Sequence, residues 1–361
     1  MMNQQTAEAE RRLSLDQWER IGTLVLDAAG SPHDESELVS QSLVRSSAMG
    51  HDSHGVMRLI QYVGDIRKGI LKPGAPFTIV NQTPATAVAD AHRGWGQVSA
   101  HKAMTLAIEK AEQQGIGVVA VHNNHHVGRL GQYPAMAVPN DMIGLGFISS
   151  GGGIDRVAPW GGIDARLGPN PMSFATPSGR DWPVLLDMTT SVVPEGKVRV
   201  ARYRNLPLPE GCLIDPEGRP TTDPNVHYGD PLGALLCLGG IAGHKGYGLN
   251  LMMELLGGAL SGTGVRGTPD RPEGNGVHFQ AIKIASFVAM QQFLNDVDQL
   301  ILHVKSSRRQ PGVSEILFPG EPEHRNLQRR MQEGIPVDVN VWKELCEVAD
   351  ELGVGPLNDV G

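Results

Sequence analysis

The chain has 361 residues, more than one hydrophobic core usually organises, so two or three domains or subdomains are expected. Hydrophobic residues make up 40% and charged residues 19%, as is usual for a soluble globular protein. The net charge of −8 and the 5% share of aromatic residues argue against a nucleic acid or an anionic membrane as the main partner.

The first 70 residues predict a small helical unit. Apolar residues recur with helical spacing directly after Ser14, whose hydroxyl suits the first position before a helix. Glycines at positions 50 and 69 suit helix ends. Helices are therefore expected over about 15–25, 35–48 and 56–68.

The pattern changes at Lys72-Pro73-Gly74, where short strand-like runs begin to alternate with helical stretches. Such alternation is typical of an α/β core. Strands are expected near 78–80, 87–89, 118–121, 142–148 and 172–176, and helices over 99–114 and 130–138. Residues 151–235 are rich in Gly and Pro and predict loops with a few strands.

The last third of the chain predicts further helices. One follows Gly246, and an amphipathic one covers about 286–304. Two more are expected near 323–333 and 340–352. No internal repeat is found.

The cysteines and the chain start bear on location. Cys212, Cys237 and Cys346 are few, odd in number and far apart, so they predict a reducing compartment and no disulfide framework. The first 19 residues lack the apolar core of a secretory signal, and the longest nearly apolar run, 232–242, is too short to span a bilayer. The sequence therefore predicts a cytoplasmic protein.

The first candidate site is the segment Gly50 to Arg58, followed by Tyr62. In a helix, His54, Arg58 and Tyr62 would share one face, because they are four residues apart. A titratable group beside a fixed cation suits proton transfer next to a substrate carboxylate. An exposed, capped helix start would produce the same residues, and the segment alone does not decide between the two interpretations.

A second histidine cluster, from His122 to Arg129, follows the predicted strand 118–121. Binding loops of α/β folds often lie at such strand ends. A metal site is one interpretation, but no HExxH motif and no neighbouring carboxylate support it. Polar substrate binding is favoured over metal, and histidines bonded to backbone groups remain an alternative. The five histidines of the two clusters are His51, His54, His122, His125 and His126.

A third segment, Gly239 to Gly248, is rich in glycine and opens a helix. Free N–H groups at a helix start, together with Lys245, suit a phosphate, although the spacing is not that of a Walker A loop. Residues 115–120 match G-x-G-x-x-A in letters but precede a strand, so the Rossmann arrangement is absent.

Two turn-forming segments complete the set. Gly168-Pro169-Asn170-Pro171 predicts a rigid turn, and residues 185–191 end an apolar strand with an acid and three hydroxyl side chains. Asp187 either orients a catalytic histidine or caps a turn.

In their order along the chain, these motifs resemble the malate/L-lactate dehydrogenase type 2 family of NAD(P)-dependent 2-hydroxyacid oxidoreductases. The resemblance runs from about residue 14 to residue 355 and looks closest to the hydroxycarboxylate dehydrogenase B type. It includes DSHG-x-x-R-x-x-x-Y at 52–62, N-x-H-H-x-G-R at 123–129, APWGG at 158–162, DMTTS at 187–191, HKG at 244–246 and FPGEPE at 318–323.

The resemblance implies an α/β fold with a mixed-sheet, non-Rossmann cofactor domain and helical segments at both chain ends. It implies a helical segment over 1–72 with catalytic residues, a cofactor and substrate domain over 73–285, and a helical segment over 286–361 that packs back on the first. It also implies a homodimer, NAD as cofactor with NADP possible, and a small anionic 2-hydroxy or 2-oxo acid as substrate.

Site residues follow from the resemblance position by position. His54 matches the family's acid/base, Ser53, Arg58 and Tyr62 its substrate-side neighbours, and His126 a second active-site histidine. Asp187 is added to the catalytic set. Expected cofactor contacts are His54, Gly128, Arg129, Leu130, Leu185, Leu186, Asp187, Met188, Thr189, His244, Lys245, Gly246, Gly320, Glu321, Pro322 and Glu323; no metal ligand is expected.

The sequence departs from the family pattern in two places. Pro169 stands where the family has threonine, which removes a hydroxyl and an amide N–H from the site. Residues 262–285 fit the family poorly, so no contact there is inferred. A cyclic-imine reductase of the same family, a histidine-bound metal hydrolase and an anion-binding module without activity are the alternatives.

Overall fold

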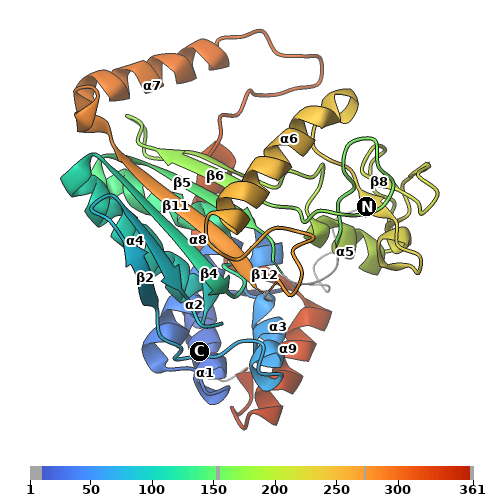
Figure 1. The fold of residues 1–361 in the computed structure, drawn as a ribbon. Helices are drawn as coiled ribbons and strands as arrows, with labels where there is room; N and C mark the ends of the chain where they lie inside the picture. Colours follow the sequence, from blue (N-terminus) through green and yellow to red (C-terminus); the bar gives the residue numbers. More distant parts are fainter. Residues whose placement is uncertain (1–9, 152–154, 272–273, 358–361) are drawn as a thin grey trace.

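The computed structural model describes residues 10–151, 155–271 and 274–357, and a seven-stranded mixed sheet forms its centre (Figure 1). Only β3 and β4 run parallel, while all other neighbouring strands run antiparallel. The predicted mixed α/β class is therefore confirmed. The strands, in order across the sheet, are β2 (Thr78–Gln82), β3 (Thr86–Asp90), β4 (Ile116–Asn124), β11 (Asn275–Lys283), β5 (Met142–Ser149), β6 (Met172–Thr176) and β7 (Val184–Met188).

The sequence did not predict the central strand β11. Its buried residues Val277 and Phe279 alternate with the polar His278 and Gln280, and glycines stand at its start. His278 is also buried, although it is polar, so the usual alternation of apolar and polar residues does not mark this strand.

Helix α4 (Gly96–Gln114) covers one face of the sheet through a row of buried alanines. The helix lies so close that a Cβ at Gly117 would stand 2.0 Å from the Ala107 carbonyl oxygen. Gly115 ends α4 with a φ of 82°. Gly117 therefore serves helix–strand packing and Gly115 ends the helix, so neither belongs to a Rossmann turn.

The other face of the sheet carries α6 (Gly243–Met253), which continues as the π-helix η6 (Glu254–Ala259). Gly257 and Gly276 let η6 approach the sheet, since a Cβ at Gly276 would stand 2.0 Å from the Gly257 oxygen. Helix α6 begins at Gly243, three residues before the predicted start at Gly246.

Segments from near both chain ends form one helical unit below the sheet (Figure 1). Strands β1 (Glu10–Leu13) and β12 (Ile335–Asp338) pair antiparallel, and one core joins the flanking helices. Ser14 and Gln17 form a capping box, which confirms the predicted helix start. The helices are α1 (Leu15–Ala28), α2 (His33–Ala48), α3 (Arg58–Arg67) and α9 (Val339–Glu351).

The other two C-terminal helices are placed differently. Helix α8 (Glu321–Glu333) reaches the helical unit through Arg330, which forms an ion pair with Asp52. Helix α7 (Met290–Lys305) lies at the opposite end of the sheet (Figure 1), and Ile301 is its one buried residue. Of the expected segment 286–361, α7 therefore does not pack back on the N-terminal part.

Two segments differ from the predicted elements. The expected helix 130–138 consists of 3₁₀ turns over Leu130–Gln132 and Pro134–Asn140, because Pro134 and Pro139 lack the N–H donors of an α-helix. The predicted loop region contains a helix, α5 (Glu195–Tyr203). Only two of its residues, Val198 and Ala201, are buried, and the charged residues and the glycine around them give no helical pattern of apolar residues in the sequence.

A small sheet of β10 (Ala234–Leu235), β8 (Leu213–Ile214) and β9 (Pro220–Thr221) packs beside α5. Among the described residues, no helix combines the length and the apolar character needed to cross a membrane.

Candidate active site

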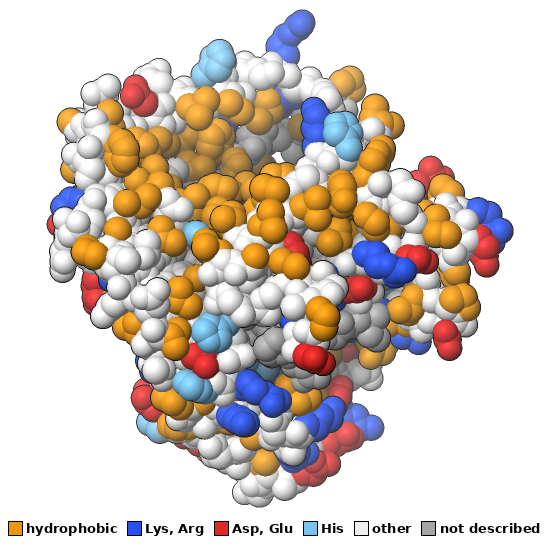
Figure 2. Space-filling view, in the orientation of Figure 1, with side chains coloured by type: hydrophobic (Ala, Val, Ile, Leu, Met, Phe, Trp, Pro, Cys, Tyr) orange, Lys and Arg blue, Asp and Glu red, His pale blue; other side chains and the backbone are white. Residues whose placement is uncertain are grey.

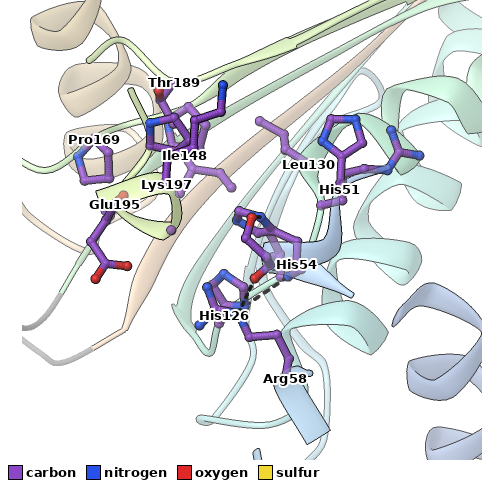
Figure 3. A pocket seen from close by; sticks show the side chains of 18 of the residues that line it. His51, His54, Arg58, His126, Leu130, Ile148, Pro169, Thr189, Glu195 and Lys197 are labelled. Atoms are coloured by element: carbon purple, nitrogen blue, oxygen red, sulfur yellow. Dashed lines mark hydrogen bonds between the residues drawn. The ribbon is translucent and has the colours of Figure 1, made fainter. Parts of the chain in front are cut away.

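A cavity of about 1170 Å³ lies between the helical unit, the ends of strands β4, β5 and β7, and helix α5. Small-molecule sites usually have about 300–1,000 Å³, so this cavity has room for a large ligand together with a small one. Figure 3 shows His54, His126 and Arg58 on one side of it and Glu195 and Lys197 on the other. Predicted site residues in its wall are Ser53, His54, Arg58, His126, Gly128, Arg129, Leu130, Asp187, Met188 and Thr189.

His54 is the last residue of a 3₁₀ turn over Asp52–His54, and α3 begins only at Arg58. The predicted single helix face is therefore wrong for His54, although His54 and Arg58 both reach the cavity. The Ser53 hydroxyl lies 3.0 Å from His54 Nδ1, which leaves the other ring nitrogen, Nε2, without a protein partner among the described residues.

Helix α5 supports this arrangement from the opposite side. A Cβ at Gly196 would stand 2.8 Å from the Ser53 Cβ, so the glycine lets the helix press against Ser53.

The rings of His54 and His126 stack with their centroids 5.5 Å apart and an interplanar angle of 24°. Burial, followed by the charge of Arg58, lowers the pKa of His54 to about 3. The same two causes lower the pKa of His126 well below its usual value. Both imidazoles are thus neutral at pH 7 in the absence of an anionic ligand.

Tyr62 lies behind His126 and does not line the cavity. Its hydroxyl is 2.8 Å from His126 Nδ1, and burial raises the pKa of Tyr62 to about 12. Tyr62 therefore contacts the second histidine, whereas the sequence comparison had suggested a place beside the substrate.

Arg58 presents a cation to the cavity without an ion-pair partner among the described residues. Its Nε donates to the Ser53 carbonyl oxygen at 2.7 Å, and its Nη1 donates to Gln61. Burial lowers the pKa of Arg58, which reflects the cost of keeping this charge away from water. Glu195 and Asp65 offset part of its charge, but from beyond ion-pair distance. A fixed guanidinium without a direct ion-pair partner suits a carboxylate ligand.

A second buried cation, Arg129, lines the cavity near β7. Its side chain is 3% exposed, and its Nη1 lies 3.9 Å from Asp187. Within the part of the chain that the structure describes, its Nε and Nη1 have no hydrogen-bond partner. Asp187 accepts the Gly131 amide at 2.7 Å, and burial raises the pKa of Asp187. No hydrogen bond or ion pair joins Asp187 to His54 or His126 in the described part of the chain.

Asp187 therefore does not orient a histidine in the way that the sequence suggested. In its place, Ser53 contacts His54 and Tyr62 contacts His126. Asp187 instead forms a buried ion pair with Arg129.

His51, one of the five histidines of the two predicted clusters, also lines the cavity. Its Nε2 lies 3.4 Å from Glu323 at the start of α8. Sequence reasoning missed this position because Glu323 lies more than 270 residues further along the chain. The contact brings Glu323 close to the cavity although it is not part of the wall.

The other residues predicted to contact a cofactor lie outside the cavity wall. Gly320 packs on β7, where a Cβ would stand 2.3 Å from the Pro183 carbonyl oxygen. Glu321 forms ion pairs with Lys305 and Arg325. Their roles stay predictions, as do those of Leu185, Leu186, His244, Lys245, Gly246 and Pro322.

Two of the clustered histidines have partners outside the stacked histidine pair, although His125 also lines the cavity. His122 Nδ1 lies 2.9 Å from the Ser261 carbonyl oxygen, and His125 Nε2 lies 3.2 Å from Asp65. Within residues 10–151, 155–271 and 274–357, no group of three or more His, Cys, Asp or Glu side chains is placed to hold a metal.

The two prolines of the Gly168-to-Pro171 turn form part of the cavity wall. The buried carboxylate of Glu254 binds this turn from the side away from the cavity. Asn170 donates to Glu254 Oε2 at 2.8 Å, and its Oδ1 accepts the Ser150 amide at 2.9 Å. Glu254 also accepts from Arg271 Nη1 at 2.9 Å, from the Arg266 amide at 2.6 Å and from Ser149 at 3.0 Å. One carboxylate thus satisfies four donors.

We expect Glu254→Gln to lower the free energy of unfolding by about 3–5 kcal/mol, because it leaves Arg271 without its buried partner. The amide would also point a donor at a site where every neighbour donates. Denaturant unfolding measures this loss. Glu112→Gln, at an exposed ion pair with Lys283, is the matched control and should cost less than about 1 kcal/mol. Equal losses in the two variants would contradict the role of Glu254.

Helix α5 adds charged residues that sequence reasoning missed. Lys197 and Arg204 line the cavity and are exposed. Glu195 accepts from the Tyr228 hydroxyl and from Arg199, each at 2.6 Å. No motif marks these residues, since they are recognised only once α5 faces the cavity.

The chain is similar to known proteins along nearly its whole length. The malate/L-lactate dehydrogenase family pattern matches residues 13–346. Malate dehydrogenase of Pyrococcus horikoshii is 38% identical over 338 residues, 91% of this chain and 92% of that protein. Hydroxycarboxylate dehydrogenase B of Escherichia coli O157:H7 is 37% identical over 344 residues, 90% of each chain.

A solved structure confirms the fold and carries one of the alternative activities in its name. Delta1-piperideine-2-carboxylate reductase of Pseudomonas syringae matches with a TM-score of 0.80 and 25% identity, over 94% of this chain and all of that one. The resemblance seen in the ordered motifs is thus confirmed, and this chain belongs to the malate/L-lactate dehydrogenase family.

Proposed function

We propose that this protein, as an oxidoreductase of its family, interconverts a 2-hydroxy acid and a 2-oxo acid by hydride transfer with a nicotinamide cofactor. The observation that carries the proposal is the buried Arg58, which has no direct ion-pair partner among the described residues, beside the neutral His54. This pair offers an anchor for a carboxylate and a proton acceptor next to it. The names of two relatives, malate dehydrogenase and hydroxycarboxylate dehydrogenase B, denote enzymes that act on acids of this class.

In the oxidation direction, Arg58 holds the substrate carboxylate, and His54 Nε2 takes the proton of the C2 hydroxyl. The bound carboxylate offsets the positive charge of Arg58, which is one of the causes that hold the pKa of His54 low. Substrate binding therefore makes His54 a stronger base at the moment when a base is needed. His126 donates a hydrogen bond to the same oxygen.

The cavity fits a nicotinamide dinucleotide on the side of Arg129. The Nε and Nη1 of Arg129 are buried donors without a hydrogen-bond partner among the described residues, as expected where a ligand oxygen binds. Gly128, Leu130, Asp187, Met188 and Thr189 form the neighbouring wall. We assign NAD as the cofactor, with NADP possible; when bound, the nicotinamide supplies or accepts the hydride at C2.

A cyclic-imine reductase is the second candidate, favoured by the likeness to delta1-piperideine-2-carboxylate reductase. Its substrate also carries a carboxylate next to the carbon that receives hydride, so Arg58 and His54 would keep their places. A panel of 2-oxo acids and cyclic imines, each with NADH and with NADPH, separates the candidates through the nicotinamide absorbance. The proposal predicts faster turnover of a 2-oxo acid, and inactivity with the entire panel contradicts both candidates. Activity lost on addition of a chelator would instead favour the metal hydrolase.

We also propose a cytoplasmic homodimer, with the second copy covering the apolar surface above the sheet. Figure 2 shows hydrophobic side chains gathered where α6 crosses the sheet. Exposed side chains on α6, η6 and α7 include Leu249, Met252, Leu255, Leu300 and Leu302. A contiguous apolar surface of this kind is rare on a monomer.

The oligomeric state tests this proposal. Light scattering after size-exclusion chromatography should give twice the chain mass for the wild type. Met252→Glu combined with Leu255→Glu should give a monomer, because each buried carboxylate would lack a partner. Arg219→Glu, at an exposed position on the small sheet, is the control and should leave the dimer intact. A monomeric wild type contradicts the proposal.

A further inference from the structure

A row of hydrogen bonds leads from α4 to His126 on the side of His126 that faces away from the cavity. Gln97 Nε2 donates to the Tyr62 hydroxyl at 2.8 Å, and that hydroxyl lies 2.8 Å from His126 Nδ1. Gln97 and Tyr62 are both fully buried. Neither lines the cavity, so both act on a ligand only through His126.

The Gly128 backbone amide fixes the direction of these hydrogen bonds. Its N–H can only donate, and its nitrogen lies 3.3 Å from His126 Nδ1, so Nδ1 accepts. The Tyr62 hydroxyl then donates to the same nitrogen, and its oxygen accepts from the Gln97 NH₂ group. Two donors aimed at one ring nitrogen require that this nitrogen carries no proton. A neutral imidazole has one N–H, which must therefore be at Nε2.

Close backbone packing holds Gln97 and His126 at these positions. A Cβ at Gly96 would stand 2.2 Å from the His126 carbonyl oxygen, so the start of α4 is pressed against the backbone of His126. A Cβ at Gly128 would stand 3.3 Å from Gln97 Nε2, and this glycine has a φ of 73°. Glycines at both positions let Gln97 lie within reach of Tyr62.

We propose that Gln97 is a positioning residue that, through Tyr62, keeps the proton of His126 on Nε2, so that His126 donates to the substrate oxygen. The last step rests on the proposed function, whereas the position of the proton does not. Without Gln97, the Tyr62 hydroxyl is no longer fixed as a donor to Nδ1, and the imidazole can move its proton to Nδ1. His126 then has a lone pair, in place of a donor, on the nitrogen opposite Tyr62.

The first test is the position of the proton in the full-length protein without ligands. Nitrogen-15 NMR of histidine-labelled protein distinguishes the two tautomers, and His126→Asn identifies the His126 signals by their loss. We expect the Nε2–H tautomer in the wild type and a measurable share of Nδ1–H in Gln97→Met and in Tyr62→Phe. The Nδ1–H tautomer in the wild type, or no change in either variant, overturns the proposal whatever the protein's activity.

The second test uses turnover. We expect Gln97→Met to lower kcat about tenfold and Tyr62→Phe about 100-fold, as for loss of a donor to a developing oxyanion, with KM for the cofactor unchanged. The double variant should match Tyr62→Phe within about twofold, because Gln97 acts through Tyr62. A merely structural role would make the two losses multiply, and that result overturns the proposal. Gln132→Met, which removes a hydrogen bond to Ser42 that involves neither Tyr62 nor His126, is the matched control and should leave kcat unchanged.

Discussion

His54→Ala should lower kcat about 10²–10⁴-fold, the usual contribution of a positioned acid or base. The fold should remain intact, because the His54 side chain borders the cavity and has one protein hydrogen bond, with Ser53. Initial rates with a 2-hydroxy acid and NAD measure the loss. His101→Ala, at an exposed histidine of α4, is the matched control and should keep the wild-type rate. A kcat close to wild type, with an unchanged melting temperature, would remove His54 from the proposed chemistry.

The pH dependence gives a sharper signature of the same residue. Oxidation releases one proton, so the ratio of kcat/KM for reduction to kcat/KM for oxidation must fall about tenfold per pH unit. With a pKa of about 3 in the free protein, His54 is already the required neutral base at every pH above about 4. We therefore expect kcat/KM for oxidation to stay level between pH 5 and 8, as far as His54 determines it. The decrease with rising pH should appear in reduction, which needs protonated His54.

Arg58→Lys should raise KM for the acid substrate about 10–100-fold, the loss expected for one or two charge-assisted hydrogen bonds. The guanidinium reaches the Ser53 carbonyl oxygen and Gln61 while still facing the cavity. An ammonium group cannot keep both contacts and also bind a carboxylate in a bidentate manner. Steady-state kinetics with the acid varied at saturating cofactor measure the change.

Arg67→Lys provides the control for this variant. Arg67 lies at the far end of the same helix, where it forms an exposed ion pair with Glu351. Its replacement should leave KM unchanged. If Arg58→Lys also leaves KM unchanged, the substrate carboxylate binds elsewhere.

The sequence allowed prediction of those candidate site residues that stand in contiguous motifs. His54 and Arg58, and then His126 and Arg129, each lie within a few residues of one another, so short spacing alone brought them together. The predicted strands of the sheet were found where apolar residues fill a run, as in β4 and β5. The capped start of α1 was likewise visible in local residues.

The remaining features depend on contacts between distant parts of the chain. His51 approaches Glu323, and Gln97 meets Tyr62, only after the helical unit closes on the sheet. Nothing next to Gln97 in the sequence distinguishes it from other glutamines at helix starts. Helix α5 and strand β11 were missed because charged or polar residues interrupt their apolar patterns, and tertiary packing, not local propensity, fixes them.

The central claim is direct hydride transfer to C2 of a 2-oxo acid with a proton delivered to its oxygen, and isotope transfer tests it most directly. The protein is supplied with a 2-oxo acid and with NADH deuterated at C4 on one face, in parallel for each face. The account predicts that one of the two labelled cofactors places a single deuterium on C2 of the product, and that D₂O as solvent places none there. Product without deuterium from either cofactor, or with C2 deuterium derived from solvent, would contradict the account.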